Sequence, residues 1–214
     1  MQLLYRKREA SATLKSRSVL GKVTHLKQKE QPTKRRKQRK AVVQTVRRDH
    51  FDAVVNAIRE PYHTMMILQL AVGLRPGETC KMRLSDVDLK TGDIITPRDG
   101  KTGERHLCFD TEGACAEALR VWMEARPSGP YLFGGETPII VNTYNITIHR
   151  CCVRLGIPPF HSYALRHTYA TELIHEKQAI SDISMALGHH SVLTTAKYYI
   201  HADPEMIRRL NAGR

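Results

Sequence analysis

The chain has 214 residues, of which 41% are hydrophobic and 26% charged, as is ordinary for a soluble globular protein with one compact domain. It has no apolar signal segment and no run of eighteen apolar residues, which argues against a membrane protein. Its five cysteines lack C-x-x-C spacing, which argues against a disulfide framework and favours the cytoplasm. The formal net charge of +13 favours a polyanionic partner, for which nucleic acid is the natural candidate.

The positive charge is concentrated in the N-terminal quarter of the chain. Residues 1–48 hold 16 Lys and Arg against two Glu and so carry +14, whereas the remainder holds 18 against 19 and carries −1. The densest part of the block comprises Lys34, Arg35, Arg36, Lys37, Arg39 and Lys40. We expect residues 1–44 to be a basic, flexible and disordered arm that binds DNA phosphates. The alternative is a solvated tail without a specific partner.

Two helices are predicted after this arm. The first is capped by Thr45 and ends before Pro61. Its buried face is marked by Phe51, Val54, Val55 and Ile58. The second, at 62–72, is apolar nearly all round, which predicts a buried central helix.

A junction between two helices follows at residues 73–78. Gly73 can end the central helix, Pro76 suits the first position of the next helix, and Glu78 falls in its first turn. Arg75 is therefore predicted to be held between two helices, where its side chain has little freedom.

A short β-hairpin is predicted from the β-forming residues at 92–96 and 105–109, with Lys101 near its tip. Helical patterns follow at 112–124 and 142–155, separated by a loop at 127–137. The first of these helices is expected to turn Ala114, Ala118, Val121 and Trp122 inward.

The stretch 161–201 contains three short helical patterns. In the first, Leu165, Tyr169 and Leu173 form an apolar stripe, and Arg166 is expected at its edge. The second is predicted to be capped by Ser181, with Asp182 in its first turn, to bury Ile183 and Leu187, and to stop at Gly188, directly before His189. The third, at 192–199, ends in Tyr198 and Tyr199.

These residue types fit phosphoryl transfer through a tyrosine. Arginine offers a planar fork of donors for phosphate oxygens, histidine can donate or shuttle a proton, and a tyrosine hydroxyl can be a covalent nucleophile. The stretch contains three runs in order, L-R-H-T-Y-A-T, L-G-H and T-T-A-K-Y. Arg166 is 23 positions before His189, and His189 is 9 positions before Tyr198. The runs and their spacing resemble the C-terminal signature of the tyrosine recombinase (phage integrase) family. G-L-R-x-x-E at Arg75 and K-T-G at Lys101 resemble its first arginine box and its hairpin lysine.

The resemblance implies a fold class and a domain plan. We expect a mainly α protein with a small antiparallel β-hairpin (α+β), in which 45–202 form the catalytic domain and 203–214 a tail helix that contacts a neighbouring protomer. The expected partner is double-stranded DNA, on which the protein self-assembles into a tetrameric synapse, in the cytoplasm and without a membrane. The implied function is site-specific DNA recombination by strand cleavage and rejoining through a 3′-phosphotyrosyl intermediate.

The resemblance also implies roles for the individual residues. Arg75, Arg166 and His189 would hold the scissile phosphate, Glu78 would brace the site, and Lys101 would protonate the leaving oxygen. Tyr198 would be the nucleophile on spacing. Tyr199-Ile200-His201, however, resembles the Y-x-H that often surrounds the family nucleophile, so Tyr199 is the rival. The chemistry needs no cofactor and no metal, and the histidines of the chain lack H-E-x-x-H or Cys/His ligand spacing.

Two departures from the family pattern weaken the prediction of strong catalysis. The position three before Arg166, usually histidine in H-x-x-R, is Tyr163, and tyrosine with a pKa of about 10 is a poor base at neutral pH. Family members usually place a helical core-binding domain before the catalytic domain, and residues 1–40 show no pattern that could form it. We therefore expect either a fragment or a natural short form. The alternative function is a non-catalytic DNA-binding module that occupies recombination sites.

Overall fold

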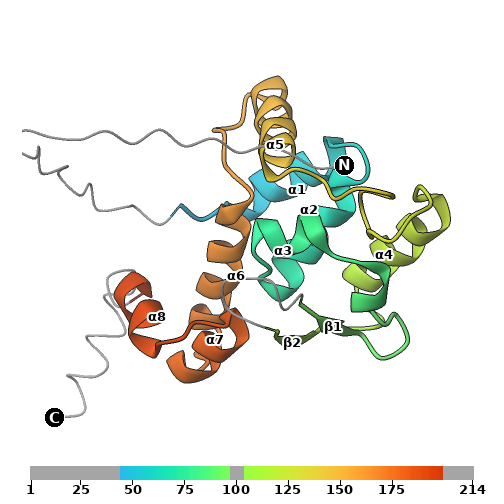
Figure 1. Ribbon diagram of the computed structural model, residues 1–214. Coiled ribbons are helices and arrows are strands. Elements are labelled where there is room, and N and C mark those ends of the chain that lie inside the picture. Colours follow the sequence, from blue (N-terminus) through green and yellow to red (C-terminus); the bar gives the residue numbers. More distant parts are fainter. Residues whose placement is uncertain (1–43, 97–103, 200–214) are drawn as a thin grey trace, which may run out of the picture. The chain divides into compact units, whose positions relative to one another are not determined.

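The computed structural model describes residues 44–96 and 104–199, and side chains only as far as residue 196. The elements, in chain order, are α1 (Arg48–Ala57), α2 (Tyr62–Val72), α3 (Pro76–Lys81), the 3-10 helix η1 (Leu84–Asp86), β1 (Asp93–Ile95), β2 (His106–Cys108), α4 (Ala114–Ala125), α5 (Val141–Leu155), α6 (Tyr163–His175), α7 (Ile180–Leu187) and α8 (Val192–Tyr199) (Figure 1). The predicted class, mainly α with a small antiparallel hairpin, is confirmed. Residues 1–43 of the predicted basic arm, Lys101, His201 and the predicted tail helix at 203–214 lie outside the described residues.

Helix α2 is the centre of the core. It packs against α1, α3, α4, α5 and α6, and Met65, Met66 and Leu68 are completely buried. A helix that packs against five others needs apolar residues on most of its surface, so its lack of a polar face is explained by its position. Its one buried amide, Gln69, donates to the carbonyl of Ser162 at 2.9 Å and so ties α2 to the start of α6.

Helix α1 buries the predicted face, but it begins later than predicted. The residue before its first turn is Arg47, not Thr45. The reason is tertiary, because Val46 is buried and its backbone N–H donates to the Thr168 hydroxyl at 2.8 Å. This bond across to α6 holds residues 44–47 in a non-helical conformation, and α1 begins only at Arg48.

Helix α4 was predicted with the wrong face inward. Ala114 is exposed, Ala118 is half-buried and Val121 is 55% exposed. The buried residues of α4 are Cys115, Ala116, Leu119 and Trp122. Of the predicted residues only Trp122 is buried, and its indole N–H donates to the carbonyl of Leu132 at 2.9 Å, which sets the rotation of the helix. The predicted stripe is the true stripe displaced by one position, an error that matters in a helix with 3.6 residues per turn.

The hairpin has the predicted form. Strands β1 and β2 are antiparallel, with Ile94 opposite Leu107 and Ile95 opposite His106. Beyond the strands, the N–H of Thr96 donates to the carbonyl of Arg105, and the N–H of Arg105 donates to the Thr96 hydroxyl. These two bonds extend the ladder and fix the backbone that carries Arg105.

The C-terminal helices α6, α7 and α8 follow one another in the order predicted (Figure 1). Helix α7 begins at Ile180 after Ala179, so Ser181 is an exposed residue inside the helix and not its cap. The carbonyl of Ala179 accepts the first helical bonds, from Asp182 and Ile183. The predicted stop is confirmed, because Gly188 ends α7 in the left-handed conformation at φ 61°.

Glycine at position 73 allows α6 to pack against the end of α2. Gly73 ends α2 at φ 66°, as predicted, and a Cβ there would lie 2.3 Å from Cδ1 of Tyr169. Any side chain would push α6 away. This contact brings the segment that carries Arg75 close to the helix that carries Arg166. No helix in residues 44–96 or 104–199 has the length and apolar character needed to cross a membrane.

Candidate functional site

Arg75 occupies the junction between α2 and α3. Its backbone N–H donates to Oε2 of Glu78 at 2.7 Å, and its Nη1 donates to Oε1 of the same carboxylate at 2.9 Å. Its Nη2 also donates to the carbonyl of Gly188 at 3.3 Å. Since both ends of the side chain are held, the guanidinium is aimed in one direction, as the sequence predicted for this position.

Arg166 is buried, in contrast to the prediction that it lies at the edge of an apolar stripe. Its exposed fraction is 2%. The guanidinium is accommodated because Nη1 donates to the carbonyl of Gly73 at 2.7 Å and Nη2 donates to the carbonyl of Leu187. These carbonyls end α2 and α7, where backbone acceptors have no partner within the helix. Burial, together with Arg75 and Arg105, lowers the pKa of Arg166 to about 10, so it remains charged at neutral pH.

His189 lies between Arg166 and helix α8. Its Nε2 is 3.4 Å from Nη2 of Arg166, and its Nδ1 is 2.8 Å from the hydroxyl of Thr195. Because the guanidinium can only donate, the ring proton is assigned to Nδ1 and is donated to Thr195. Burial, followed by the charges of Arg166 and Arg75, lowers the pKa of His189 to about 4, so the imidazole is neutral at pH 7.

These side chains surround one cavity. Its volume is about 220 Å³, and it is lined by Arg75, Tyr163, Arg166, His167, Leu187, His189 and Thr194. Two arginines and a histidine that are far apart in the sequence thus face the same hollow. The space holds several water molecules of ~30 Å³ each, and so also a phosphate group. Guanidinium groups beside a partly enclosed space bind phosphate oxygens well.

The structure places the other predicted site residues as follows. Tyr163 is at the rim, with 45% of its surface exposed, and its ring meets that of His167 edge-on with centroids 4.8 Å apart. Tyr198 and Tyr199 belong to the last turn of α8, and their side chains are outside the described part of the chain. Lys101 and His201 are also outside it.

Two residues of the site were missed at the sequence level. His167 lines the cavity one helical turn after Tyr163, and that spacing of four was a usable signal. Arg105 does not line the cavity but binds next to residues that do. Its Nη2 meets Oε2 of Glu78 at 2.5 Å, and its Nη1 donates to the carbonyl of Ala186 at 2.8 Å. No local pattern identifies Arg105, because its partners are distant in the sequence.

The electrostatics of the site favour an anion. Glu78 is the carboxylate between Arg75 and Arg105, and Arg166 adds a third guanidinium. One negative charge is therefore shared by three positive ones. Burial lowers the pKa of Arg105, and burial, followed by Arg166, lowers the pKa of His167. A bound phosphate group would offset part of the remaining positive charge.

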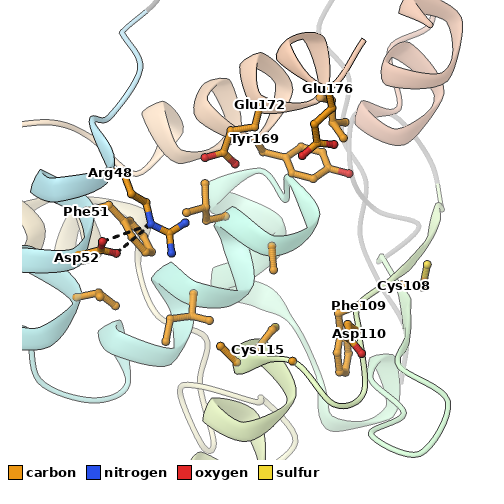
Figure 2. Close-up of a pocket in the computed structure, with 17 residues that line it drawn as sticks. Arg48, Phe51, Asp52, Cys108, Phe109, Asp110, Cys115, Tyr169, Glu172 and Glu176 are labelled. Carbon is orange, nitrogen blue, oxygen red and sulfur yellow. Dashed lines mark hydrogen bonds and ion pairs between the residues drawn. The ribbon is translucent and has the colours of Figure 1, made fainter. Parts of the chain in front are cut away.

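A second cavity, of about 560 Å³, has the opposite character (Figure 2). Apolar side chains such as Phe51, Leu70 and Leu173 line it, drawn from α1, α2 and α6. Its acidic residues are Asp52, Asp110, Glu172 and Glu176. Arg48 pairs with Asp52 at 3.1 Å, and burial raises the pKa of Glu172. Carboxylates repel phosphate, so of these two cavities the arginine cavity is the better suited to an anionic group.

No group of three His, Cys, Asp or Glu side chains within residues 44–96 and 104–196 is arranged to hold a metal ion. The arginine cavity offers donors, whereas a hard cation needs oxygen ligands. Its chemistry is therefore that of binding an anion through fixed hydrogen-bond donors.

Comparison with known proteins matches residues 35–206 to the phage integrase family. The chain is 27% identical over 166 residues to tyrosine recombinase XerC of Bacillus subtilis, which covers 67% of this chain and 50% of that protein. Its fold is similar to the crystal structure of XerA recombinase, with a TM-score of 0.64 and 28% identity over 79% of this chain and 64% of the other. XerH site-specific recombinase bound to its difH substrate has a similar fold, with a TM-score of 0.64 at 16% identity. The match covers 79% of this chain and 54% of the other. The alignments span 35% to 53% of the length of four curated relatives.

Proposed function

Because this chain belongs to the phage integrase family, we propose that it performs site-specific DNA recombination, cutting and rejoining strands through a 3′-phosphotyrosyl intermediate. The observation that carries the proposal is the convergence of Arg75, Arg166 and His189 on one cavity of about 220 Å³. Thr194 of α8 lines the same cavity, so the helix that carries the two tyrosines begins at the site.

In the proposed reaction, the Tyr198 hydroxyl attacks a DNA phosphodiester. A bond forms between phosphorus and the phenolic oxygen, which gives up its proton. The bond from phosphorus to the 5′ oxygen breaks, and this oxygen takes up a proton and leaves as a 5′ hydroxyl. The hydroxyl of another strand then reverses the step, so the bond energy is retained without a cofactor. The nine-residue spacing from His189 supports Tyr198 over Tyr199 as the nucleophile.

Arg75 and Arg166 are the proposed donors to the charge that develops on the phosphate. Both are held before substrate arrives, Arg75 by Glu78 and Arg166 by the carbonyl of Gly73. Preorganised donors of this kind contribute about 3 kcal/mol each to transition-state stabilisation. Rearrangement during the reaction is small because the backbone already orients both groups.

His189 is proposed to change protonation state on binding. Its imidazole is neutral in the free protein because burial and Arg166 hold its pKa at about 4. A bound phosphate brings negative charge next to the ring, and negative charge favours the imidazolium form. His189 then has two N–H donors, one for Thr195 and one for the phosphate. Lys101 is the proposed donor of a proton to the leaving 5′ oxygen.

DNA binding and assembly complete the proposal. Residues 1–44 are proposed to bind the DNA backbone through Lys34, Arg35, Arg36, Lys37, Arg39 and Lys40. Copies of the chain are proposed to assemble on cytoplasmic DNA into a tetrameric synapse, with residues 203–214 as the contact between protomers. The charge of this arm supports the first part, because each neutralised phosphate releases counterions.

A second candidate function is a DNA-binding module without catalysis. Tyr163 favours it, because the family usually has histidine there and a phenol is a weaker base than an imidazole. The aromatic contact of Tyr163 with His167 supports a role in holding the cavity wall. His167 lines the same cavity, however, so an imidazole is still present next to the phosphate position.

A nicked suicide substrate separates the two functions. The duplex carries a nick next to the cleavage point, so that the short fragment bearing the released 5′ hydroxyl diffuses away and the covalent adduct accumulates. We expect a protein–DNA adduct with the wild-type chain and with Tyr199→Phe, and none with Tyr198→Phe. DNA binding without any adduct would support the module, and an adduct lost only in Tyr199→Phe would assign the nucleophile to Tyr199.

A further inference from the structure

The C-terminal end of α7 is held by three arginines on three consecutive carbonyls. Arg105 donates to Ala186 at 2.8 Å, Arg166 to Leu187, and Arg75 to Gly188 at 3.3 Å. The last carbonyls of a helix have no partner within it and form the negative end of its dipole, so guanidinium donors suit this position. The three arginines come from separate parts of the chain, the hairpin, α6 and the start of α3. The backbone that leads into His189 is therefore fixed from three directions.

Arg105 differs from the other two arginines because it does not line the cavity. Its side chain is 7% exposed, and its guanidinium spans Oε2 of Glu78 and the carbonyl of Ala186. Glu78 in turn accepts from both the backbone N–H and Nη1 of Arg75. The planar guanidinium of Arg105 thus connects the segment that carries Arg75 to the end of α7, directly before His189.

We propose that Arg105 is a positioning residue that sets the distance between the phosphate-binding arginines and His189, acting through Glu78 on one side and the end of α7 on the other. It touches no substrate. Its guanidinium replaces the bond that the Ala186 carbonyl lacks and limits the movement of Glu78. Loss of the Arg105 guanidinium would let His189 and Arg75 move relative to each other.

Gly188 allows this packing. A Cβ at position 188 would lie 2.1 Å from Cδ and 2.8 Å from Nε of Arg105. The stem of Arg105 therefore passes directly beneath the turn between α7 and His189. Because Arg105 fills the space that a side chain at position 188 would need, a displacement of Arg105 is expected to affect the turn.

A purely stabilising role explains the arrangement less well. Taking a guanidinium and a carboxylate out of water offsets much of what their pairing contributes, so a buried ion pair is weak evidence of stability. Arg105 also lies close to Arg75 and Arg166, and the three positive charges repel one another. A positive group at this crowded place is better explained by the geometry it imposes.

The test compares Arg105→Lys with Arg126→Lys. Lysine keeps the charge but is a point donor that lacks the planar fork of arginine. Arg126 is the matched control, because its Nη2 also donates to backbone carbonyls, Gly129 at 2.7 Å and Tyr131 at 3.1 Å, but in a loop outside the arginine cavity. Three quantities are measured on the full chain, namely the rate of adduct formation on the nicked duplex, the dissociation constant for an intact duplex, and the NMR position and pKa of the His189 ring.

We expect Arg105→Lys to slow adduct formation by roughly ten- to a hundredfold with an unchanged dissociation constant, since misplacement of about 1 Å can have an effect of this size. The His189 ring signal should move, and Arg126→Lys should leave all three quantities unchanged. An unmoved His189 signal in Arg105→Lys would overturn the proposal, as would an equal change in Arg126→Lys. The adduct readout rests on the proposed function, whereas the His189 signal does not, so a wild-type chain that forms no adduct would refute recombination alone.

A second variant covers the case in which Arg105→Lys does not fold. Glu78→Gln keeps the size of the side chain and removes the charge that Arg105 binds. It should move the His189 signal whether or not Arg105→Lys folds. Where both single variants fold, the double variant should lose less in the rate of adduct formation than the sum of the two separate losses, because both residues act on one network. Fully additive losses in the rate of adduct formation would contradict the connection from Arg105 to His189. A His189 signal that Glu78→Gln leaves unchanged would contradict it as well.

Discussion

Nη2 of Arg166 lies 3.4 Å from Nε2 of His189, although Arg166 belongs to α6 and His189 follows α7. The arginine can only donate, so it favours the neutral imidazole and opposes protonation. A bound phosphate reverses this preference because it places negative charge beside both groups. The pair therefore makes the protonation of His189 depend on whether the cavity is filled.

The first prediction concerns the titration of His189. In the free protein its ring should remain neutral until the pH approaches 4, because burial and the charge of Arg166 oppose protonation. With a saturating DNA duplex, the pKa should rise towards or above the ordinary value of about 6.5. NMR of the His189 ring, assigned with His189→Gln, measures both values. A pKa near 6.5 in the free protein would contradict the electrostatic account.

The second prediction concerns stability at low pH. The folded-state pKa of His189 is lowered to about 4, so the unfolded chain takes up a proton at a higher pH than the folded one. This contribution to the free energy of unfolding is complete above pH 6.5 and is lost as the pH falls towards 4. Urea unfolding between pH 7 and 4 should show a smaller decline in His189→Gln than in the wild type. His106→Gln is the control, because His106 is exposed and should leave the decline unchanged.

The third prediction separates the two arginines of the cavity. Arg75→Ala and Arg166→Ala should each slow adduct formation by roughly a hundredfold or more, as expected for the loss of a preorganised donor. Arg166→Ala should also lower the melting temperature more than Arg75→Ala does, because it leaves the buried carbonyls of Gly73 and Leu187 without their donor. Calorimetry and the nicked-duplex assay measure the two effects. Arg120→Ala, an exposed arginine on α4, should change neither.

The fourth prediction concerns the departure at Tyr163. Tyr163→His restores the residue usual in the family at the rim of the cavity, where a nearby base can contribute 10²- to 10⁴-fold to proton transfer. We expect faster adduct formation by at least about tenfold. Tyr163→Phe keeps the ring contact with His167 and should not be faster than the wild type. If Tyr163→His is no faster, proton removal at this position does not limit the reaction.

The fifth prediction compares two helix-ending glycines. Gly156 ends α5 at φ 67° and has open space around its missing Cβ, so Gly156→Ala should lower the free energy of unfolding by only about 1–2 kcal/mol, the strain of the left-handed conformation. Gly188→Ala should have the same strain and also collide with Arg105. Chemical denaturation should show a larger loss for Gly188→Ala. Equal losses would mean that Arg105 moves aside freely.

Much of the fold was predictable because local signals and tertiary packing agree. The run 62–72 was predicted within its true bounds, since an apolar helix followed by Gly73 has one plausible end. Where tertiary contacts compete with local signals, the prediction was wrong. Thr45 has the chemistry of a cap, but Val46 is held by Thr168, and Ser181 falls inside α7 because Ala179 accepts the first bonds.

The sequence by itself determined several helix ends and the spacing of Arg166, His189 and Tyr198. Through its resemblance to the recombinase family, it also led to the prediction that Arg75, Arg166 and His189 belong to one site. Spacing along the chain reports chemistry and helix ends, because these depend on near neighbours. Only the tertiary structure decided that Arg166 is buried between two helix ends, that His189 is neutral, and that Arg105 connects Glu78 to α7. Those properties depend on solvent exclusion and on partners 21 to 113 residues away, which local sequence does not encode.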